Sequence, residues 1–190
     1  MESSICKTAA NASGLNNSDF QSMLEIAKKA ALLGGNILMK HYGLIKKIEN
    51  KSRIGDLVTN ADIEAEEKII EFLTTMISDI GIYAEESGSS GSQKGLTWCI
   101  DPLDGTTNYA HGYPLFATSI GLLWKNKPIL GAISVPFLKE LFWASPKVGS
   151  FCNEKKISVS KSSSIRNSLL VTGFAYDRQT TIDNNYAEFC

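Results

Sequence analysis

Two aspartates, Asp101 and Asp104, lie three positions apart where an apolar run of the chain ends. Residues 96–100 are mainly apolar, which predicts a short buried strand. Because Pro102 cannot donate a hydrogen bond to a neighbouring strand, we expect the strand to stop at Asp101. Carboxylates held this close repel each other strongly unless a cation lies between them. The pair therefore favours a cation site at the end of a strand.

The residues that follow are suited to binding an anion. Gly105 allows the backbone to approach a ligand closely, and Thr106 and Thr107 supply hydroxyl and amide donors. With the two aspartates they would form a cradle for a metal ion and a phosphate group. The competing interpretation is an ordinary turn, since Asp-Pro and Asp-Gly dipeptides occur in the turns of unrelated proteins.

Residues 98–109 as a whole distinguish these interpretations. The segment Trp-Cys-Ile-Asp-Pro-Leu-Asp-Gly-Thr-Thr-Asn-Tyr resembles the first signature of the inositol monophosphatase family, W-x-[IV]-D-P-[IL]-D-G-T-x-N-[FY], at every defined position. Members of that family are Mg²⁺-dependent phosphatases of small sugar and polyol phosphates. The resemblance implies an α+β fold, a layered α/β sandwich of the sugar-phosphatase type.

Two acidic segments upstream extend the resemblance. Asp62 ends the pattern D-L-V-T-x-x-D at the start of a predicted helix, where the helix dipole alone would also favour an acid. Glu85 and Glu86 follow a short predicted strand at residues 80–84, and neighbouring side chains of an extended chain point to opposite faces. The family pattern here is G-E-E-S, and this chain has Ala84 in place of the glycine. We expect one glutamate of the pair to face the site.

The resemblance also assigns metal ligands. Glu85, Asp101 and the backbone carbonyl of Leu103 would bind a first ion. Asp101 would bridge to a second ion that Asp104 also holds. Carboxylate and carbonyl oxygens are the ligands that Mg²⁺ prefers, so this set favours Mg²⁺ over Zn²⁺, and the family implies two or three ions in a complete site.

The remaining catalytic and substrate-binding positions follow from the same resemblance. Asp62 and Thr106 would orient the attacking water, which places them with Glu85 among the catalytic residues. The phosphate group of the substrate would be bound by Leu103, Asp104, Gly105 and Thr106.

Composition and charge narrow the class of protein. The chain has 190 residues and a formal net charge of −1, so it has room for one domain and part of another and offers no basic surface for nucleic acid. No apolar run approaches the roughly 20 residues that a membrane span requires. Four scattered cysteines favour a reducing compartment, so we expect a cytoplasmic protein, with organelle targeting left open. The family would also imply a homodimer.

Periodicity divides the chain into three parts. Residues 1–17 are rich in Ser, Ala and Asn and predict a disordered tail. Residues 18–152 predict two helices packed on a mostly antiparallel sheet, which would carry the metal site. Residues 153–190 predict the start of a second α/β domain.

The two predicted helices have distinct end signals. The first would begin at a capping box formed by Ser18 and Gln21 and end before Gly43. The second would begin near Asp62. Its apolar side would consist of Ile63, Ile69, Ile70, Phe72, Leu73 and Met76.

The last part of the chain is expected to be truncated. Residues 168–173 predict a strand and residues 181–190 begin a helical pattern, but one strand cannot bury a sheet. Family members continue into a second half with the motif W-D-x-A-A-G, whose aspartate binds the second metal, and the 190 residues lack this motif. We therefore expect a complete N-terminal half and a truncated C-terminal half.

The activity implied is Mg²⁺-dependent hydrolysis of a small phosphorylated polyol or sugar, with inositol monophosphate as the first substrate to test. Two alternatives stay open. One is a related phosphatase of sugar, histidinol or nucleoside phosphates. The other is an inactive, truncated fragment that binds metal.

Overall fold

The computed structural model describes residues 2–44, 48–50, 57–91 and 95–172, and its main element is one eight-stranded sheet. The strand order is β10-β9-β8-β7-β6-β5-β3-β4. The bounds are β3 Gly81–Ala84, β4 Gly88–Ser90, β5 Leu96–Asp104, β6 Ala117–Trp124, β7 Lys127–Val135, β8 Glu140–Ser145, β9 Gly149–Cys152 and β10 Lys155–Lys156. A separate ribbon pairs β1 (Ile48–Asn50) with β2 (Leu57–Thr59). The prediction of an α+β fold with a mostly antiparallel sheet is confirmed, because β3 and β5 form the one parallel pair in the described sheet.

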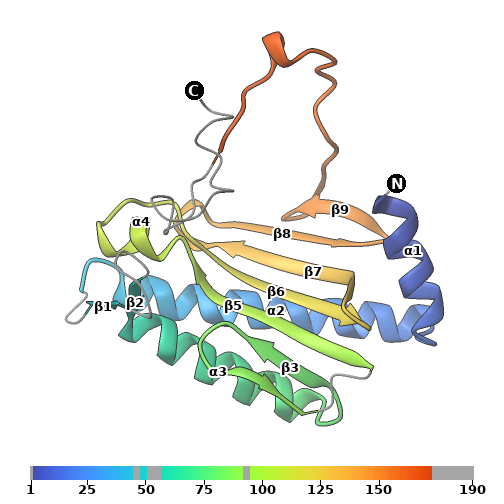
Figure 1. The fold of residues 1–190 in the computed structure, drawn as a ribbon, viewed down its shortest axis with the longest axis horizontal. Coiled ribbons are helices and arrows are strands. Elements are labelled where there is room, and N and C mark those ends of the chain that lie inside the picture. Colours follow the sequence, from blue (N-terminus) through green and yellow to red (C-terminus); the bar gives the residue numbers. More distant parts are fainter. Residues whose placement is uncertain (1, 45–47, 51–56, 92–94, 173–190) are drawn as a thin grey trace, which may run out of the picture.

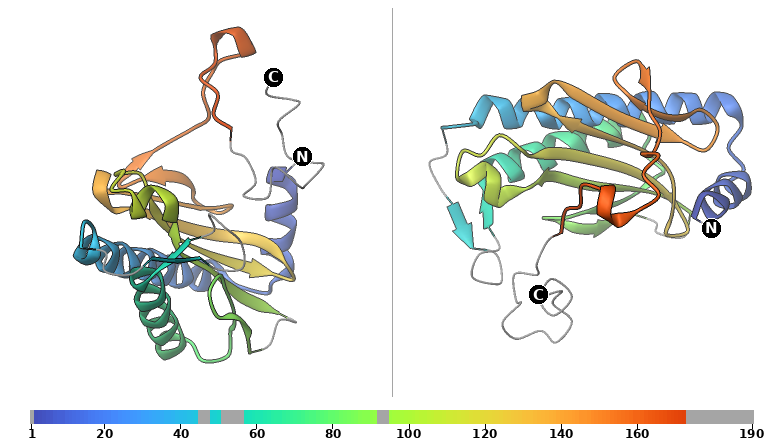
Figure 2. Two further views of the ribbon diagram at one scale, coloured as in Figure 1. Left: turned by 60° about the vertical axis from the view of Figure 1, so that its left-hand side comes forward. Right: turned by 90° about the horizontal axis from the view of Figure 1, so that it is seen from above.

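Two long helices cover one face of this sheet (Figures 1 and 2). They are α2 (Asn17–His41) and α3 (Asn60–Met76), and the shorter helices are α1 (Glu2–Ala12) and α4 (Thr106–Ala110). Single 3₁₀ turns span Pro136–Leu138 and Ile165–Asn167. None of the helices in the described part of the chain is long and apolar enough to cross a membrane.

The core lies between the helices and the sheet. Its largest fully buried side chains include Trp98 on β5, Leu24 on α2 and Leu73 on α3. Lys125 and Asn126 connect β6 to β7 with positive φ values of 49° and 64°, which is the two-residue hairpin turn that matches strand twist.

Helix α2 approaches the sheet closely at Gly34. A Cβ atom at this position would lie 2.6 Å from the Thr118 methyl carbon and 2.8 Å from Ile69 Cδ1. Thr118 is itself held, because its hydroxyl donates a 2.9 Å hydrogen bond to the carbonyl of Pro102. The contact therefore joins α2, α3 and the segment of β5 that contains the two aspartates.

The N-terminal prediction was wrong for residues 2–12, which form α1 instead of a disordered tail. Ala9 and Ala10 are buried in the core, and α1 packs against β7. Alanine is the best helix former, and its small side chain lets a short helix dock closely. Composition alone did not reveal the surface that stabilises α1.

The start of α2 also differs from the prediction. Its N-cap is Asn16, whose side-chain oxygen accepts hydrogen bonds from the backbone amides of Ser18 and Asp19. The Asp19 carboxylate accepts the backbone N–H of Asn16 in return, at 2.9 Å. Asn is at least as good an N-cap as Ser, so this box forms two residues earlier than the one expected at Ser18. The other end is as predicted, since Gly43 follows the C-cap with a φ of 74°.

The prediction that the strand stops at Asp101 was wrong. β5 continues to Asp104, with Asp101 paired to Ser119 and Asp104 to Ala117, and the register shifts between the two aspartates. Pro102 falls within this irregular stretch, where a missing N–H costs no ladder hydrogen bond.

The expected apolar side of α3 needs one correction. Ile63 and Met76 are exposed, because the buried face is set by Ala61, Ala65, Ile69 and Leu73. After α3 and β3, the positive φ of Gly88 allows β4 to turn back onto β3.

The first residues of the C-terminal part still belong to the eight-stranded sheet. β10 pairs with β9, so the sheet continues past the expected domain boundary at residue 153. Residues 157–172 project from the sheet (Figure 1), and Leu169 and Val171 are fully exposed. The strand predicted at residues 168–173 is not formed in its described part, residues 168–172. The helix expected at residues 181–190 lies outside the described residues.

The close contact at Gly34 leads to a stability prediction. Gly34→Ala is expected to lower the free energy of unfolding by about 1–3 kcal/mol, because overpacking outweighs the roughly 1 kcal/mol gain in helix propensity. Urea unfolding followed by circular dichroism measures this. Asn36→Ala, at an exposed position of the same helix, is the control and should not destabilise the protein. A Gly34→Ala protein as stable as wild type would contradict the tight packing.

Candidate active site

The parallel pairing of β3 and β5 brings the first two predicted ligands together. Ala84 is in register with Ile100, so Glu85 and Asp101 follow at the same end of neighbouring strands. The Glu85 backbone N–H donates to the Ile100 carbonyl at 3.1 Å, which extends the ladder to the site. The Glu85 side chain is within hydrogen-bonding contact of the Asp101 carboxyl group.

This crowding changes the acid–base behaviour of Asp101. Burial, then the negative charge and hydrogen bond of Glu85, then the charge of Asp104 raise the pKa of Asp101 from 3.8 to about 7. One of its oxygens, Oδ1, is buried without a hydrogen-bond partner among the described residues. A buried carboxylate oxygen without a donor, next to two further carboxylates, is the environment that a cation would stabilise.

The irregular stretch of β5 and the turn after it contain a second set of candidate site residues. The Leu103 side chain is buried among residues of α2 and α3, and the Leu103 carbonyl accepts the Thr106 hydroxyl at 3.0 Å. Asp104 is exposed. Gly105 has a φ of 86°, and a Cβ atom there would lie 3.1 Å from the Leu115 carbonyl. Only glycine accepts this turn without strain, so the chain can pass from the strand directly into α4.

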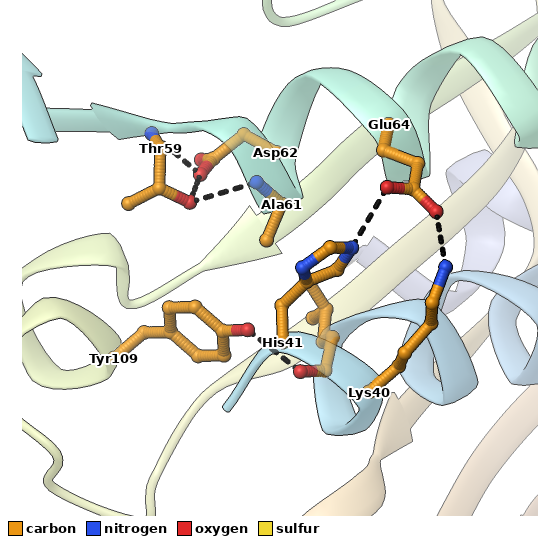
Figure 3. A network of polar contacts seen from close by, with 8 residues as sticks. Lys40, His41, Thr59, Ala61, Asp62, Glu64 and Tyr109 are labelled. Atoms are coloured by element: carbon orange, nitrogen blue, oxygen red, sulfur yellow. Dashed lines mark hydrogen bonds and ion pairs between the residues drawn. The ribbon is translucent and has the colours of Figure 1, made fainter. Parts of the chain in front are cut away.

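Asp62 occupies the third position of α3 and is almost completely buried. Its Oδ2 atom accepts hydrogen bonds from the Thr59 backbone N–H at 2.9 Å and from the Thr59 hydroxyl at 2.6 Å (Figure 3). Its Oδ1 atom lies 3.4 Å from the Thr106 hydroxyl. The capping box therefore fixes one carboxylate oxygen and leaves the other facing Thr106.

Helix α4, which carries Thr106, is held against α2. The Tyr109 hydroxyl donates a 2.6 Å hydrogen bond to the Leu38 carbonyl (Figure 3), and the Tyr42 hydroxyl donates to the Gly112 carbonyl at 2.6 Å. The Tyr109 ring also packs edge-on against Phe116 at 4.8 Å. Burial, followed by the charge of Asp62, raises the pKa of Tyr109, so it remains a neutral hydrogen-bond donor.

An ion-pair cluster links the end of α2 to α3 close to Asp62. His41 Nε2 lies 2.7 Å from one Glu64 oxygen, and Lys40 Nζ lies 3.1 Å from the other (Figure 3). These hydrogen bonds lower the pKa of the Glu64 carboxyl group. The cluster is at the surface and joins the two helices, so His41 has a structural partner here.

The structure places the sequence-predicted site residues in two adjoining groups, with Gly105 at the turn between Asp104 and Thr106. Glu85, Asp101 and Asp104 form one group of acids, and Asp62, Thr106 and the Leu103 carbonyl form the other. Within the described ranges, however, no three His, Cys, Asp or Glu side chains are already gathered as a complete metal-binding cluster. The carboxylate and carbonyl oxygens present fit a hard cation such as Mg²⁺ in chemical type.

Sequence reasoning missed three supporting residues. Thr59 caps α3 and orients Asp62, Thr118 binds the Pro102 carbonyl, and Glu66 binds the turn after Glu85. Glu66 had a visible signal, since an acid four residues after Asp62 lies on the same helix face as the core residues.

Comparison with known proteins identifies the family of this chain. The model of the Inositol monophosphatase family matches residues 19–190. An inositol-1-monophosphatase from Synechocystis sp. is 47% identical over 184 residues, which cover 96% of this chain and 64% of that protein. A fructose-1,6-bisphosphatase/inositol-1-monophosphatase from Aquifex aeolicus is 40% identical, with coverage of 80% and 58%.

A solved structure gives the same result for the fold. The inositol monophosphatase from Anabaena (Nostoc) sp. superimposes with a TM-score of 0.79 at 44% identity, over 90% of this chain and 63% of that chain. The 190 residues thus span less than two thirds of the length of these relatives. On the family match, the sequence identity and the shared fold, the chain belongs to the inositol monophosphatase family.

Proposed function

We propose that this chain carries the metal-binding part of a Mg²⁺-dependent phosphomonoesterase. The observation that carries the proposal is the contact between Glu85 and Asp101 at the ends of two parallel strands, with Asp104 adding a third negative charge. Like charges held together around a partly buried carboxyl group such as Asp101 are destabilising without a cation. A simple Asp-Gly turn would not require Glu85, from another strand, to face the same point.

In this proposal Glu85, Asp101 and the Leu103 carbonyl would hold one Mg²⁺, and Asp101 and Asp104 would share a second. Mg²⁺ supplies charge neutralisation of the phosphate, a more acidic water and stabilisation of the leaving oxygen. The chain's own contribution is to keep one of these oxygens, Asp101 Oδ1, buried and without a hydrogen-bond donor among the described residues.

The second group of residues would handle the proton of the attacking water. Thr106 and Asp62 lie 3.4 Å apart, and the Leu103 carbonyl lies 3.0 Å from the same hydroxyl. The capping hydrogen bonds from Thr59 hold the Asp62 carboxyl group in a fixed orientation. Asp62, through Thr106, would therefore orient the water and accept its proton, while the backbone from Leu103 to Thr106 would bind the phosphate.

Inositol monophosphate is the substrate that we propose first. The name of the Synechocystis relative, at 47% identity, supports it. The double name of the Aquifex aeolicus relative supports a sugar bisphosphate as the next candidate. The compartment and assembly remain predictions from the sequence: the cytoplasm, in keeping with free thiols at Cys6, Cys99 and Cys152, and a homodimer that does not bind nucleic acid.

An assay of phosphate release tests the proposal. With inositol monophosphate and Mg²⁺, the wild-type chain is expected to release phosphate. Addition of EDTA is expected to stop this release. Asp101→Asn is expected to reduce the rate about a thousandfold or more, because removing a shared ligand removes several kcal/mol of transition-state stabilisation. Asp79→Asn, an exposed aspartate between α3 and β3, makes the same chemical change elsewhere and should leave the rate unchanged.

The outcomes separate the alternatives. Release from fructose bisphosphate, histidinol phosphate or a nucleoside phosphate alone would favour a related phosphatase. Mg²⁺ binding by calorimetry without any phosphate release would identify a metal-binding fragment. If the chain neither binds Mg²⁺ nor releases phosphate, the proposal is refuted.

The raised pKa of Asp101 predicts how stability depends on pH. Between pH 3.8 and about 7, the folded chain holds a proton at Asp101 that the unfolded chain has released. The folded state binds more protons in this window, so its stability falls as the pH rises. In EDTA the unfolding free energy of wild type minus that of Asp101→Asn should therefore decrease from acid to neutral pH. Mg²⁺ should remove the decrease, and a difference independent of pH would contradict the crowding of acids.

A further inference from the structure

A buried glutamate of α3, Glu66, lies directly behind the metal-ligand turn. Only 3% of its surface is exposed, and it lies one turn after Asp62 on the helix face that packs against the sheet. One carboxylate oxygen accepts the backbone N–H of Glu86 at 2.8 Å, and the other accepts the backbone N–H of Ser87 at 2.8 Å. Within the described part of the chain Glu66 forms no ion pair with a basic side chain. Among the described residues, its hydrogen-bond partners are therefore these two backbone amides.

These two hydrogen bonds complete a continuous clamp around Glu85. The Glu85 backbone N–H is bound to the Ile100 carbonyl at 3.1 Å, and the next two amides are bound to Glu66. Three consecutive amides are thus fixed, one by β5 and two by α3. The backbone from which the Glu85 side chain extends has little freedom to turn away from Asp101.

Burying a carboxylate requires strong compensation, and two neutral amides of an exposed turn are a costly choice if only the fold benefits. The turn alone could be satisfied by water, because Glu85 and Ser87 are exposed. What the buried carboxylate adds is a fixed geometry for Glu85, and a fixed ligand loses less conformational entropy when a cation binds. Helix α3 would then fix the orientation of both acids, that of Asp62 through the capping box and that of Glu85 through Glu66.

We propose that Glu66 is a positioning residue that holds the 85–87 turn so that Glu85 is preset for cation binding. The inference rests on the proposed function, since it requires a cation at Glu85 and Asp101. It predicts that Glu66 affects metal affinity without touching the metal.

Substitution of Glu66 by Gln tests the clamp. Glutamine keeps the length of the side chain but has one acceptor oxygen, so its NH₂ group must face one of the two amides. In the 190-residue chain, titrated with MgCl₂ by calorimetry, Glu66→Gln is expected to weaken Mg²⁺ binding by about tenfold or more, the factor for one lost charge-assisted hydrogen bond. Glu66→Asp keeps two acceptors on a shorter stem and should recover part of the affinity.

Hydrogen exchange supplies a readout that does not involve the metal. Without Mg²⁺, the amides of Glu86 and Ser87 should exchange faster in Glu66→Gln than in wild type, while amides in the centre of α3 keep their rates. Glu67→Gln is the matched control, because Glu67 is the neighbouring, exposed residue of α3 and loses the same charge. It should change neither the Mg²⁺ affinity nor the exchange of the two amides.

The outcomes distinguish the two proposals. If wild type does not bind Mg²⁺, the proposed function fails and this inference fails with it. If wild type binds and folded Glu66→Gln binds equally well, only the positioning role is overturned, and a lower urea midpoint with unchanged affinity would make Glu66 a purely structural residue. If Glu66→Gln does not fold, Glu66→Asp decides, and unchanged affinity and exchange in that variant would overturn the inference.

Discussion

The mutual repulsion of carboxylates at the end of β3 and β5 is the constraint on which the rest of the site depends. Parallel pairing places Glu85 beside Asp101 by register alone, and Asp104 follows after a short irregular stretch. In water such groups would separate, but here the ladder and a partly buried setting hold them together. A fold that accepts this cost at the ends of two interior strands has a strong electrostatic preference for a cation there.

The core supports this arrangement through a few close contacts. Gly34 lets α2 lie directly over Thr118, and Thr118 holds the Pro102 carbonyl between the two aspartates. Further along α2, the Leu38 carbonyl accepts the Tyr109 hydroxyl and so anchors the helix that carries Thr106. Packing of one long helix therefore determines where two parts of the same signature lie. Changes far from the acids can shift them because protein interiors are densely packed.

Helix α3 has a similar role for the acids that lie outside this signature. Asp62 is set by the capping box with Thr59, and Glu66, one turn later, binds the turn after Glu85. The two carboxylates lie on the buried face beside Ile69 and Leu73. Helix α3 thus fixes the position of Asp62, which is expected to orient the water, relative to Glu85, which is expected to bind the metal. This favours a site whose geometry is set before the ligand binds.

The local sequence was sufficient to determine a structural feature wherever that feature depends on residues close together in the chain. The signature at residues 98–109 and the helix end at Gly43 depend on turn chemistry and residue spacing, and both were predicted. The hairpin turn at Lys125 and Asn126 is explained by the same turn chemistry. The family and the α+β class followed from the same short segments. Tertiary structure decided what depends on distant contacts: α1 forms because Ala9 and Ala10 find a surface on the core, and β5 runs through Pro102 because β6 pairs on both sides of it. It also decided that Glu66 reaches the amides after Glu85, since a hydrogen bond between residues 20 positions apart leaves no periodic pattern in the chain.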